Sequence, residues 1–275
     1  MFKKKKIFDY FFSIIGKIES NYPKDPFGTS PKANKEYYIN LLEDIKKIIH
    51  PEIDKFEAEM GFSIDLKWIE ELALFTQITI KKSKLNYQHG RLLYSSLRNY
   101  IKKNEAINFI NILETGTSRG FSTICMSKAI NDGGVNGKII TYDILPHNKK
   151  MYWNIFLDNE GTHTRKEILN KWKEETKNII FIQGSSRTNM LRNEIDRINY
   201  AFLDAEHTLS DVLSEYRYVS ERQLEGDIIV FDDVTIGTFD GVVKALNKIE
   251  LEGKYNVKYI KSSDARGYAI AYKKK

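Results

Sequence analysis

The spacing of hydrophobic residues along the chain changes near residue 105. From residue 108 onward, short apolar runs alternate with amphipathic stretches, which is typical of a parallel sheet flanked by helices. Because a helix-like segment follows each run, we expect a ligand at the carboxyl ends of the strands, near the point where the strand order reverses. Five apolar runs predict strands, at 109–114, 138–143, 179–184, 199–204 and 227–232.

Two further apolar runs close the chain, at 255–260 and 267–272. They follow a helical pattern over about 240–250, and the short polar segment between them predicts a hairpin. The sequence therefore predicts an α/β fold with a doubly wound, mostly parallel sheet of seven strands and an antiparallel edge.

The first third of the chain is predicted to be mostly helical. Apolar residues recur at helical spacing over 35–60, where His50 and Pro51 mark a break. Further helices are expected at 64–76 and 91–104.

Proline-rich and aromatic segments precede these helices. Residues 21–34 hold three of the five prolines and predict an irregular linker. The apolar run before it is too short to span a bilayer, and no small-residue cleavage site follows it. As a helix it would place Phe8, Phe11, Phe12 and Ile15 on one face, which we expect to dock within the protein.

The composition fits a globular protein with one catalytic domain and an added segment. The chain has 275 residues, of which 41% are hydrophobic and 29% charged. We divide it into a helical N-terminal segment, 1–84, and a main domain, 85–275. We expect the N-terminal segment to form a lid or to contact substrate or another subunit.

Charge and cysteine content narrow the choice of partner and compartment. The net charge is +6, but much of the excess lies at 3–6 and 273–275, and end runs of this kind are usually solvated tails. We therefore expect no nucleic-acid partner. Cys125 is the one cysteine in the sequence, which excludes an intrachain disulfide and a cysteine-based zinc site and fits the reducing cytoplasm.

A glycine-containing turn follows the first predicted strand, at 114–120. Gly116 allows close approach of a ligand, Ser118 can donate a hydrogen bond, and Gly120 lets the next helix start close to the strand. The turn lacks the dinucleotide pattern of glycine at the first, third and sixth positions. The Glu114 carboxylate would repel a pyrophosphate and suits the ammonium group of a methionine moiety. A tight turn without a ligand is the alternative.

The next two strand ends carry residues that suit a nucleoside. Asp143 can accept hydrogen bonds from both hydroxyls of a ribose, although an aspartate there can also cap a helix. Ser185 and Ser186 follow the third strand and are candidates for hydrogen bonds near an adenine. Polar residues are common in such loops, so this prediction stays open.

Carboxylates gather at the ends of the fourth and fifth strands. Asp204 ends the fourth strand, and Asp232 and Asp233 end the fifth. Three neighbouring carboxylates repel unless a cation lies among them, and a hard divalent ion with oxygen ligands meets that need. Such an ion could lower the pKa of a substrate hydroxyl while His207, three residues after Asp204, takes the proton. The alternative is that these side chains cap a loop and a helix.

Three segments together resemble a known enzyme family. They are ILETGTSRGFST at 112–123, LDAEHTLSDVLSEY at 203–216 and GDIIVFDDVTIGTFDGVVKAL at 226–246. They look like class I S-adenosylmethionine-dependent methyltransferases, and more narrowly the metal-dependent O-methyltransferases that include macrolide sugar methyltransferases and proteins labelled cephalosporin hydroxylase-like. The likeness covers roughly 85–272.

The resemblance implies a role for each motif. S-adenosylmethionine would be the methyl donor, a divalent metal, expected to be Mg²⁺, would assist, and His207 would be the base. His89, Gly90 and Arg91 lie where relatives have a segment that leads into the core, and we assign them no role. The implied donor contacts are Glu114, Gly116, Ser118, Gly120 and Asp143, and the implied metal ligands are Asp204, Asp232 and Asp233.

The leading hypothesis is methyl transfer to a hydroxyl, on a sugar of a glycan or of a glycosylated metabolite. Methylation of a nitrogen or of a nucleic acid is a second hypothesis, which lacks support because D-A-E-H stands where an N-P-P-Y motif would follow the fourth strand. A non-catalytic S-adenosylmethionine-binding protein is a third. No membrane span is expected, and the oligomeric state, a homo-oligomer included, is open.

Overall fold

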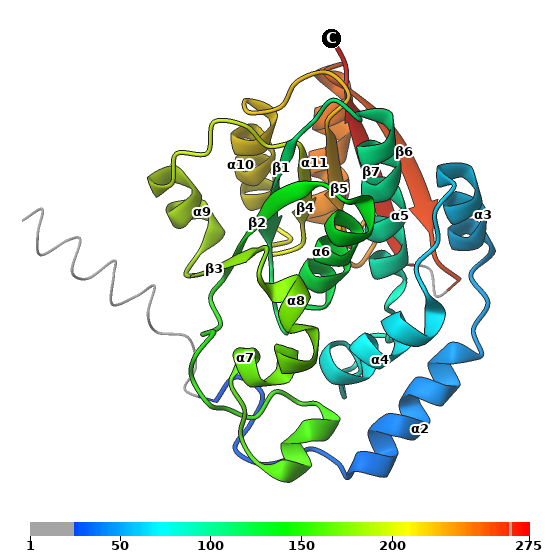
Figure 1. Cartoon of the computed structure of the whole chain (residues 1–275), viewed down its shortest axis with the longest axis vertical. Coiled ribbons are helices and arrows are strands. Elements are labelled where there is room, and N and C mark those ends of the chain that lie inside the picture. The colour runs from blue at the N-terminus through cyan, green and yellow to red at the C-terminus, as the bar shows by residue number, and fades with distance from the viewer. Residues whose placement is uncertain (1–24, 264–265) are drawn as a thin grey trace, which may run out of the picture.

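The computed structural model describes residues 25–263 and 266–275. The aromatic helix expected near the N-terminus lies outside these residues. A seven-stranded sheet runs through the middle of the molecule, with helices on both faces (Figure 1). The strands are β1 (Phe109–Thr115), β2 (Asn136–Asp143), β3 (Ile179–Gln183), β4 (Tyr200–Leu203), β5 (Ile228–Phe231), β6 (Tyr255–Lys261) and β7 (Gly267–Lys273).

The strand order is β3-β2-β1-β4-β5-β7-β6. The first five strands of this order are parallel, whereas β7 runs antiparallel to β5 and pairs with β6 as a hairpin. The order reverses between β1 and β4, so the loops after these two strands separate and leave room for a ligand. The predicted fold class and the antiparallel edge are confirmed.

Alternating side chains of the sheet face two different helical layers. In β4, Tyr200 and Phe202 pack into the cluster that holds the apolar faces of α5 and α6, whereas Ala201 and Leu203 pack with α10 and α11. All four side chains are buried. The helices of these layers are α5 (Gln88–Lys103), α6 (Phe121–Gly133), α10 (Leu209–Ser220) and α11 (Asp240–Leu251).

The helices before β1 complete one of these layers. Pro51 is the first residue of α3, where its missing N–H costs no helical hydrogen bond, so the break expected there is present. Tyr38, Phe56 and Leu72 belong to the same buried cluster as α5 and α6. The domain boundary at residue 84 stays a prediction. These helices are α2 (Lys35–Lys46), α3 (Pro51–Met60) and α4 (Leu66–Thr76).

The connections on either side of β3 differ from the helix-like segments that the sequence predicts. Each is a series of short helices and turns. In the connection before β3, buried residues between 145 and 168 build a small core of their own around the fully buried Trp153. No helix in the described part of the chain is both long and apolar enough to cross a membrane. The short elements are η1 (Phe156–Glu160), α7 (Arg165–Ile168), η2 (Leu169–Trp172), α8 (Lys173–Thr176), α9 (Ser186–Asn189) and η3 (Met190–Arg192).

Candidate active site

Two hollows adjoin at the carboxyl ends of β1, β2 and β4. The first, which we call the Asp143 hollow, has a volume of about 440 Å³ and is lined by Asp143 and Ser185. The second, the His89 hollow, has a volume of about 390 Å³ and is lined by His89. Gly116, Ser118 and Asp204 line both, together with Phe27. The structure thus places four of the predicted donor-binding residues, Gly116, Ser118, Asp143 and Ser185, around one space.

The loop after β1 lies directly against the end of β4. Gly116 has a φ of +88°, and a Cβ there would lie 2.2 Å from the carbonyl oxygen of Asp204. Its N–H donates to the carbonyl of Tyr142 at 2.9 Å. Only glycine satisfies both the positive φ and this close approach, so the glycine requirement inferred from the sequence has a structural cause.

Asp143 fastens this loop to the end of β2. One carboxylate oxygen accepts from the N–H of Ser118, and the other accepts from the N–H of Leu145 at 2.6 Å. Burial raises the pKa of Asp143, and the Arg165 guanidinium 3.7 Å away opposes that shift. Each oxygen keeps a second lone pair, so the carboxylate can still accept from a ribose. The ribose contact stays a prediction.

Glu114 lies beneath the hollows and lines neither of them within the described chain. Its side chain is fully buried and accepts hydrogen bonds from Ser122 at 2.5 Å, from Thr141 at 2.5 Å and from Thr123. Burial raises its pKa. These hydroxyls hold the first turn of α6 against β1, so the structure gives Glu114 a supporting position, and its predicted donor contact stays untested.

Gly120 also stands back from both hollows. A Cβ at this position would lie 2.8 Å from a methyl carbon of Leu169. The absence of a side chain at this position therefore lets the loop pack against the β2–β3 connection.

Ser186 contacts a buried carboxyl group that the sequence motifs did not single out. Its hydroxyl donates to Glu215 at 2.6 Å, and the hydroxyl of Thr115 donates to the other oxygen of Glu215 at 3.0 Å. Glu215 is 2% exposed, and burial raises its pKa to about 7. The interaction ties α10 to the loop after β3, which carries Ser185.

Relative to the wild type, Glu215→Gln is expected to have a higher free energy of unfolding at alkaline pH than at acidic pH. Because the folded-state pKa lies above the unfolded value, the folded state binds more protons, and wild-type stability falls as pH rises from about 4.5 through 7. Glutamine removes this ionisation and keeps partners for both hydroxyls. Urea unfolding at pH 5 and pH 8 should show a relative gain on the order of 2 kcal/mol at pH 8. Equal differences at both pH values would contradict the expectation.

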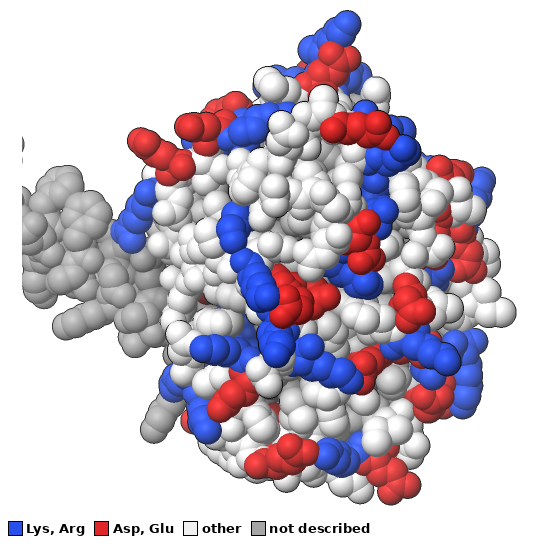
Figure 2. Space-filling view, in the orientation of Figure 1, with Lys and Arg blue, Asp and Glu red and all other residues white. Residues whose placement is uncertain are grey.

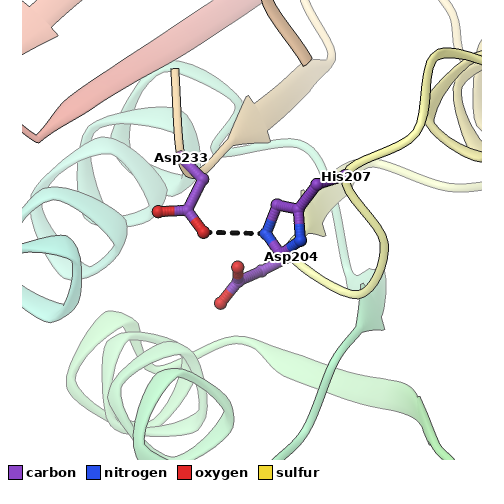
Figure 3. A group of neighbouring side chains, drawn as sticks. All are labelled: Asp204, His207 and Asp233. Carbon is purple, nitrogen blue, oxygen red and sulfur yellow. Dashed lines mark hydrogen bonds and ion pairs between the residues drawn. The ribbon is translucent and has the colours of Figure 1, made fainter. Parts of the chain in front are cut away.

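Asp204, His207 and Asp233 converge beside the hollows, from β4, the following loop and the end of β5 (Figure 3). One potential ligand atom from each lies within 4.8 Å of the others. The Nε2 atom of His207 lies 2.7 Å from a carboxylate oxygen of Asp233. This hydrogen bond raises the pKa of His207, and burial opposes the shift. Phe239 stacks on the imidazole at 4.5 Å between ring centroids.

The capping alternative applies only in part, since Asp232 accepts from the N–H of Asp233 at 2.6 Å. Thr208, one residue later than His207, is the N-cap of α10 and accepts from the N–H of Asp211. The N–H of Gly237 donates to Asp240, not to either aspartate after β5.

Asp232 lies beside Asp233 and forms an ion pair with Arg266. Its Oδ1 accepts from the Nε of Arg266 at 3.1 Å, and Arg266 also lies 2.8 Å from Asp233. Asp204, His207 and Asp233 form one group of potential metal ligands. The predicted set of Asp204, Asp232 and Asp233 stays a prediction, because the buried Oδ2 of Asp232 has no hydrogen-bond partner among the described residues. Arg266, which precedes β7, thus neutralises part of the negative charge of these aspartates. No sequence motif indicated Arg266, because it lies far along the chain from the aspartates.

Strained backbone coincides with the site. Ser118, Asn154 and Asp233 have φ values of 49°, 57° and 56°, in the left-handed region that residues with a side chain seldom adopt. Ser118 and Asn154 line the His89 hollow, and Asp233 lies beside it. Such strain persists where surrounding structure enforces a required geometry.

Comparisons with known proteins agree with this fold. Residues 113–234 match the family model described as a methyltransferase domain. The O-methyltransferase TomG from Streptomyces achromogenes, solved with SAM, is 14% identical with a TM-score of 0.54, and the match covers 78% of this chain and 92% of TomG. An O-methyltransferase from Bacillus cereus, solved with SAH, is 14% identical with a TM-score of 0.51, and the match covers 86% of this chain and 96% of that one.

No curated protein sequence matches the chain. The structural likenesses are too distant in sequence to show more than the fold, but the family match adds the methyltransferase domain to it. Residues 113–234 therefore match a methyltransferase domain, and the sheet that carries them has the fold of solved O-methyltransferases.

Proposed function

We propose that this protein transfers a methyl group from S-adenosylmethionine to a hydroxyl oxygen. The observation that carries the proposal is the junction of the two hollows at Gly116, Ser118 and Asp204. A nucleoside in the Asp143 hollow would direct its methionine end toward this junction, and an acceptor in the His89 hollow would meet it there. Two sites that open on each other suit a direct transfer between two bound molecules.

The Asp143 hollow has the polar groups that a nucleoside requires. Asp143 would accept from the ribose hydroxyls, and Ser185 would bond near the adenine. When bound, S-adenosylmethionine supplies a sulfonium methyl group, whose S–CH₃ bond breaks as the C–O bond forms and S-adenosylhomocysteine leaves. The loop at Gly116 holds the backbone close enough to β4 to fix the position of the methionine end.

His207 is the proposed base. It would take the proton that the acceptor hydroxyl loses as the C–O bond forms. Its Nε2 is oriented by Asp233, which leaves Nδ1 as the proton acceptor. A neighbouring carboxylate that fixes the imidazole and stabilises its protonated form is a common arrangement for a general base.

Asp204, His207 and Asp233 also fit a divalent cation. Two carboxylates and an imidazole within 4.8 Å are a suitable donor set, and the close carboxylates gain from a cation. When bound, the ion supplies positive charge that lowers the pKa of a hydroxyl. Mg²⁺ prefers oxygen ligands, so with Mg²⁺ on the two aspartates the imidazole remains available as the base.

The acceptor hydroxyl is proposed to belong to a sugar, of a glycan or of a glycosylated metabolite, in the cytoplasm. The resemblance of the three sequence segments to macrolide sugar methyltransferases supports this choice. A nucleic-acid acceptor has less support. On the face seen in Figure 2, lysine and arginine side chains are interspersed with aspartate and glutamate and form no single basic band.

Asp143→Ala is expected to weaken S-adenosylmethionine binding by about 10- to 100-fold, because the ribose hydroxyls lose a charged acceptor. Calorimetric titration of the wild-type protein and the variant would measure this. Transfer of labelled methyl to hydroxyl compounds, with and without a chelator, would then test the oxygen acceptor and the divalent ion. Absence of S-adenosylmethionine binding to the wild-type protein would refute the proposal.

A further inference from the structure

We propose that the acceptor molecule carries an anionic group, a carboxylate or a phosphate, which the His89 hollow binds through Lys32, Lys81 and Arg119. This inference rests on the proposed function, because it names the class of acceptor for the same site. The donor chemistry does not depend on it.

The hollow collects cations from separate parts of the chain. Lys32 lies before α2, Lys81 between α4 and α5, and Arg119 in the turn after β1, and all three line the same space. Arg266 lines it as well, and Asp204 is the acidic member of its described lining. Cations brought together from distant segments repel one another, so such a cluster gains most from a bound anion.

The four cations of the hollow differ in whether they form an ion pair. Arg266 is paired with Asp232 and Asp233. By contrast, no ion pair within the described ranges involves Lys32, Lys81 or Arg119. Lys81 is exposed, yet desolvation and the nearby Arg266 lower its pKa, and the charges of Asp232 and Asp233 only partly oppose that shift.

Arg119 is the buried element of this group. It is 8% exposed, its guanidinium lies over the ring of Phe27, and its Nε donates to the carbonyl of Trp153 at 2.6 Å. Burial lowers its pKa to about 10. A guanidinium fixed in this way retains N–H groups that can donate two parallel hydrogen bonds to a carboxylate or phosphate.

His89 adds a second polar group that lacks a partner. Its side chain is 4% exposed and stacks on Phe202, yet its Nδ1 has no hydrogen-bond partner among the described residues. A buried nitrogen of this kind is costly unless a ligand or water satisfies it. Since His89 lines the same hollow, an acceptor there could supply that partner.

The methyl donor does not balance these charges. Its methionine end carries one carboxylate and one ammonium group, which cancel, and its sulfonium adds a positive charge. The three cations that form no ion pair in the described chain therefore remain in excess when the donor is bound. An acceptor with a carboxylate or phosphate near its reactive hydroxyl, such as an acidic sugar or a sugar phosphate, would offset them.

Calorimetry on the protein saturated with S-adenosylhomocysteine tests this with three probes: glucuronate, glucose 6-phosphate and neutral glucose. We expect at least one anion to bind at least about 10-fold more tightly than glucose, and more weakly as salt increases. Lys81→Gln should reduce the anion affinity about 10-fold, Lys81→Arg should restore it, and Lys82→Gln is the matched control. Lys82 is exposed and lies outside both hollows, so its variant should bind as the wild type does.

Two results would overturn the inference. One is equal binding of the anions and glucose, or anion binding that Lys81→Gln leaves unchanged. The other is that Lys81→Gln weakens the binding of S-adenosylmethionine but not that of decarboxylated S-adenosylmethionine, and leaves anion binding unaffected. That result would show that the cations bind the carboxylate of the donor. Failure of S-adenosylhomocysteine to bind at all would instead contradict the proposed function. In that case the anion titrations would be made on the protein without it, so the two proposals can fail separately.

Discussion

Replacing His207 with alanine is expected to lower kcat for methyl transfer by about 10²- to 10⁴-fold, because the acceptor hydroxyl loses its base. The imidazole lies within 4.8 Å of Asp204 at the edge of the acceptor's His89 hollow, and it does not line the donor's Asp143 hollow. Donor affinity should therefore stay within about twofold of the wild type. Single-turnover transfer of labelled methyl, with donor affinity from calorimetry, separates the two effects.

Thr208→Ala is the control for this variant. Thr208 caps α10 next to His207, so its loss disturbs the same helix start without removing the imidazole. If both variants lose the same amount of activity, the effect of His207 is structural. An unchanged rate in His207→Ala would exclude it as the base and leave the divalent ion as the remaining source of acceptor activation.

Gly116→Ala is expected to abolish measurable donor binding and to lower the melting temperature. A Cβ at this position would lie 2.2 Å from the backbone oxygen of Asp204, so either the loop or the end of β4 must move. Both line the junction of the two hollows, and a shift of about 1 Å at such a site typically costs on the order of 10²-fold in rate. Thermal unfolding and donor titration measure the two consequences.

Gly134→Ala separates this clash from ordinary backbone strain. Gly134 also has a positive φ, +63°, but a Cβ there would meet no atom within 4 Å. Its variant should cost only the strain, about 1 kcal/mol, and leave donor binding intact. If Gly116→Ala proves no worse than Gly134→Ala, the close approach to Asp204 has no role in the site.

The fold could be predicted because its signals are local. Each strand of the parallel sheet is a short apolar run followed by a polar residue. The run alone predicts the length of the strand and the end of the strand that faces the ligand. The connection from 144 to 178 escaped prediction for the opposite reason. Its short helices depend on packing around Trp153, a contact that no periodicity encodes.

The candidate site was partly predictable for the same reason. Asp143, Asp204 and Asp233 follow strand ends, which parallel strands bring to one edge. Arg266 and Lys81 escaped because they reach the site through tertiary structure, Arg266 from the start of an antiparallel strand and Lys81 from a loop before α5. Glu215 stood inside a quoted motif, but its helical position gave no sign that it would be buried against Thr115 and Ser186.

The helices before β1 have a practical consequence for protein production. Side chains of α2, α3 and α4 share one buried cluster with α5, α6 and the sheet. A fragment that starts after residue 84 would leave the opposite half of that cluster exposed to water, as a wide apolar surface. Such a fragment should aggregate on expression, whereas fragments that keep residues from 35 onward should stay in solution.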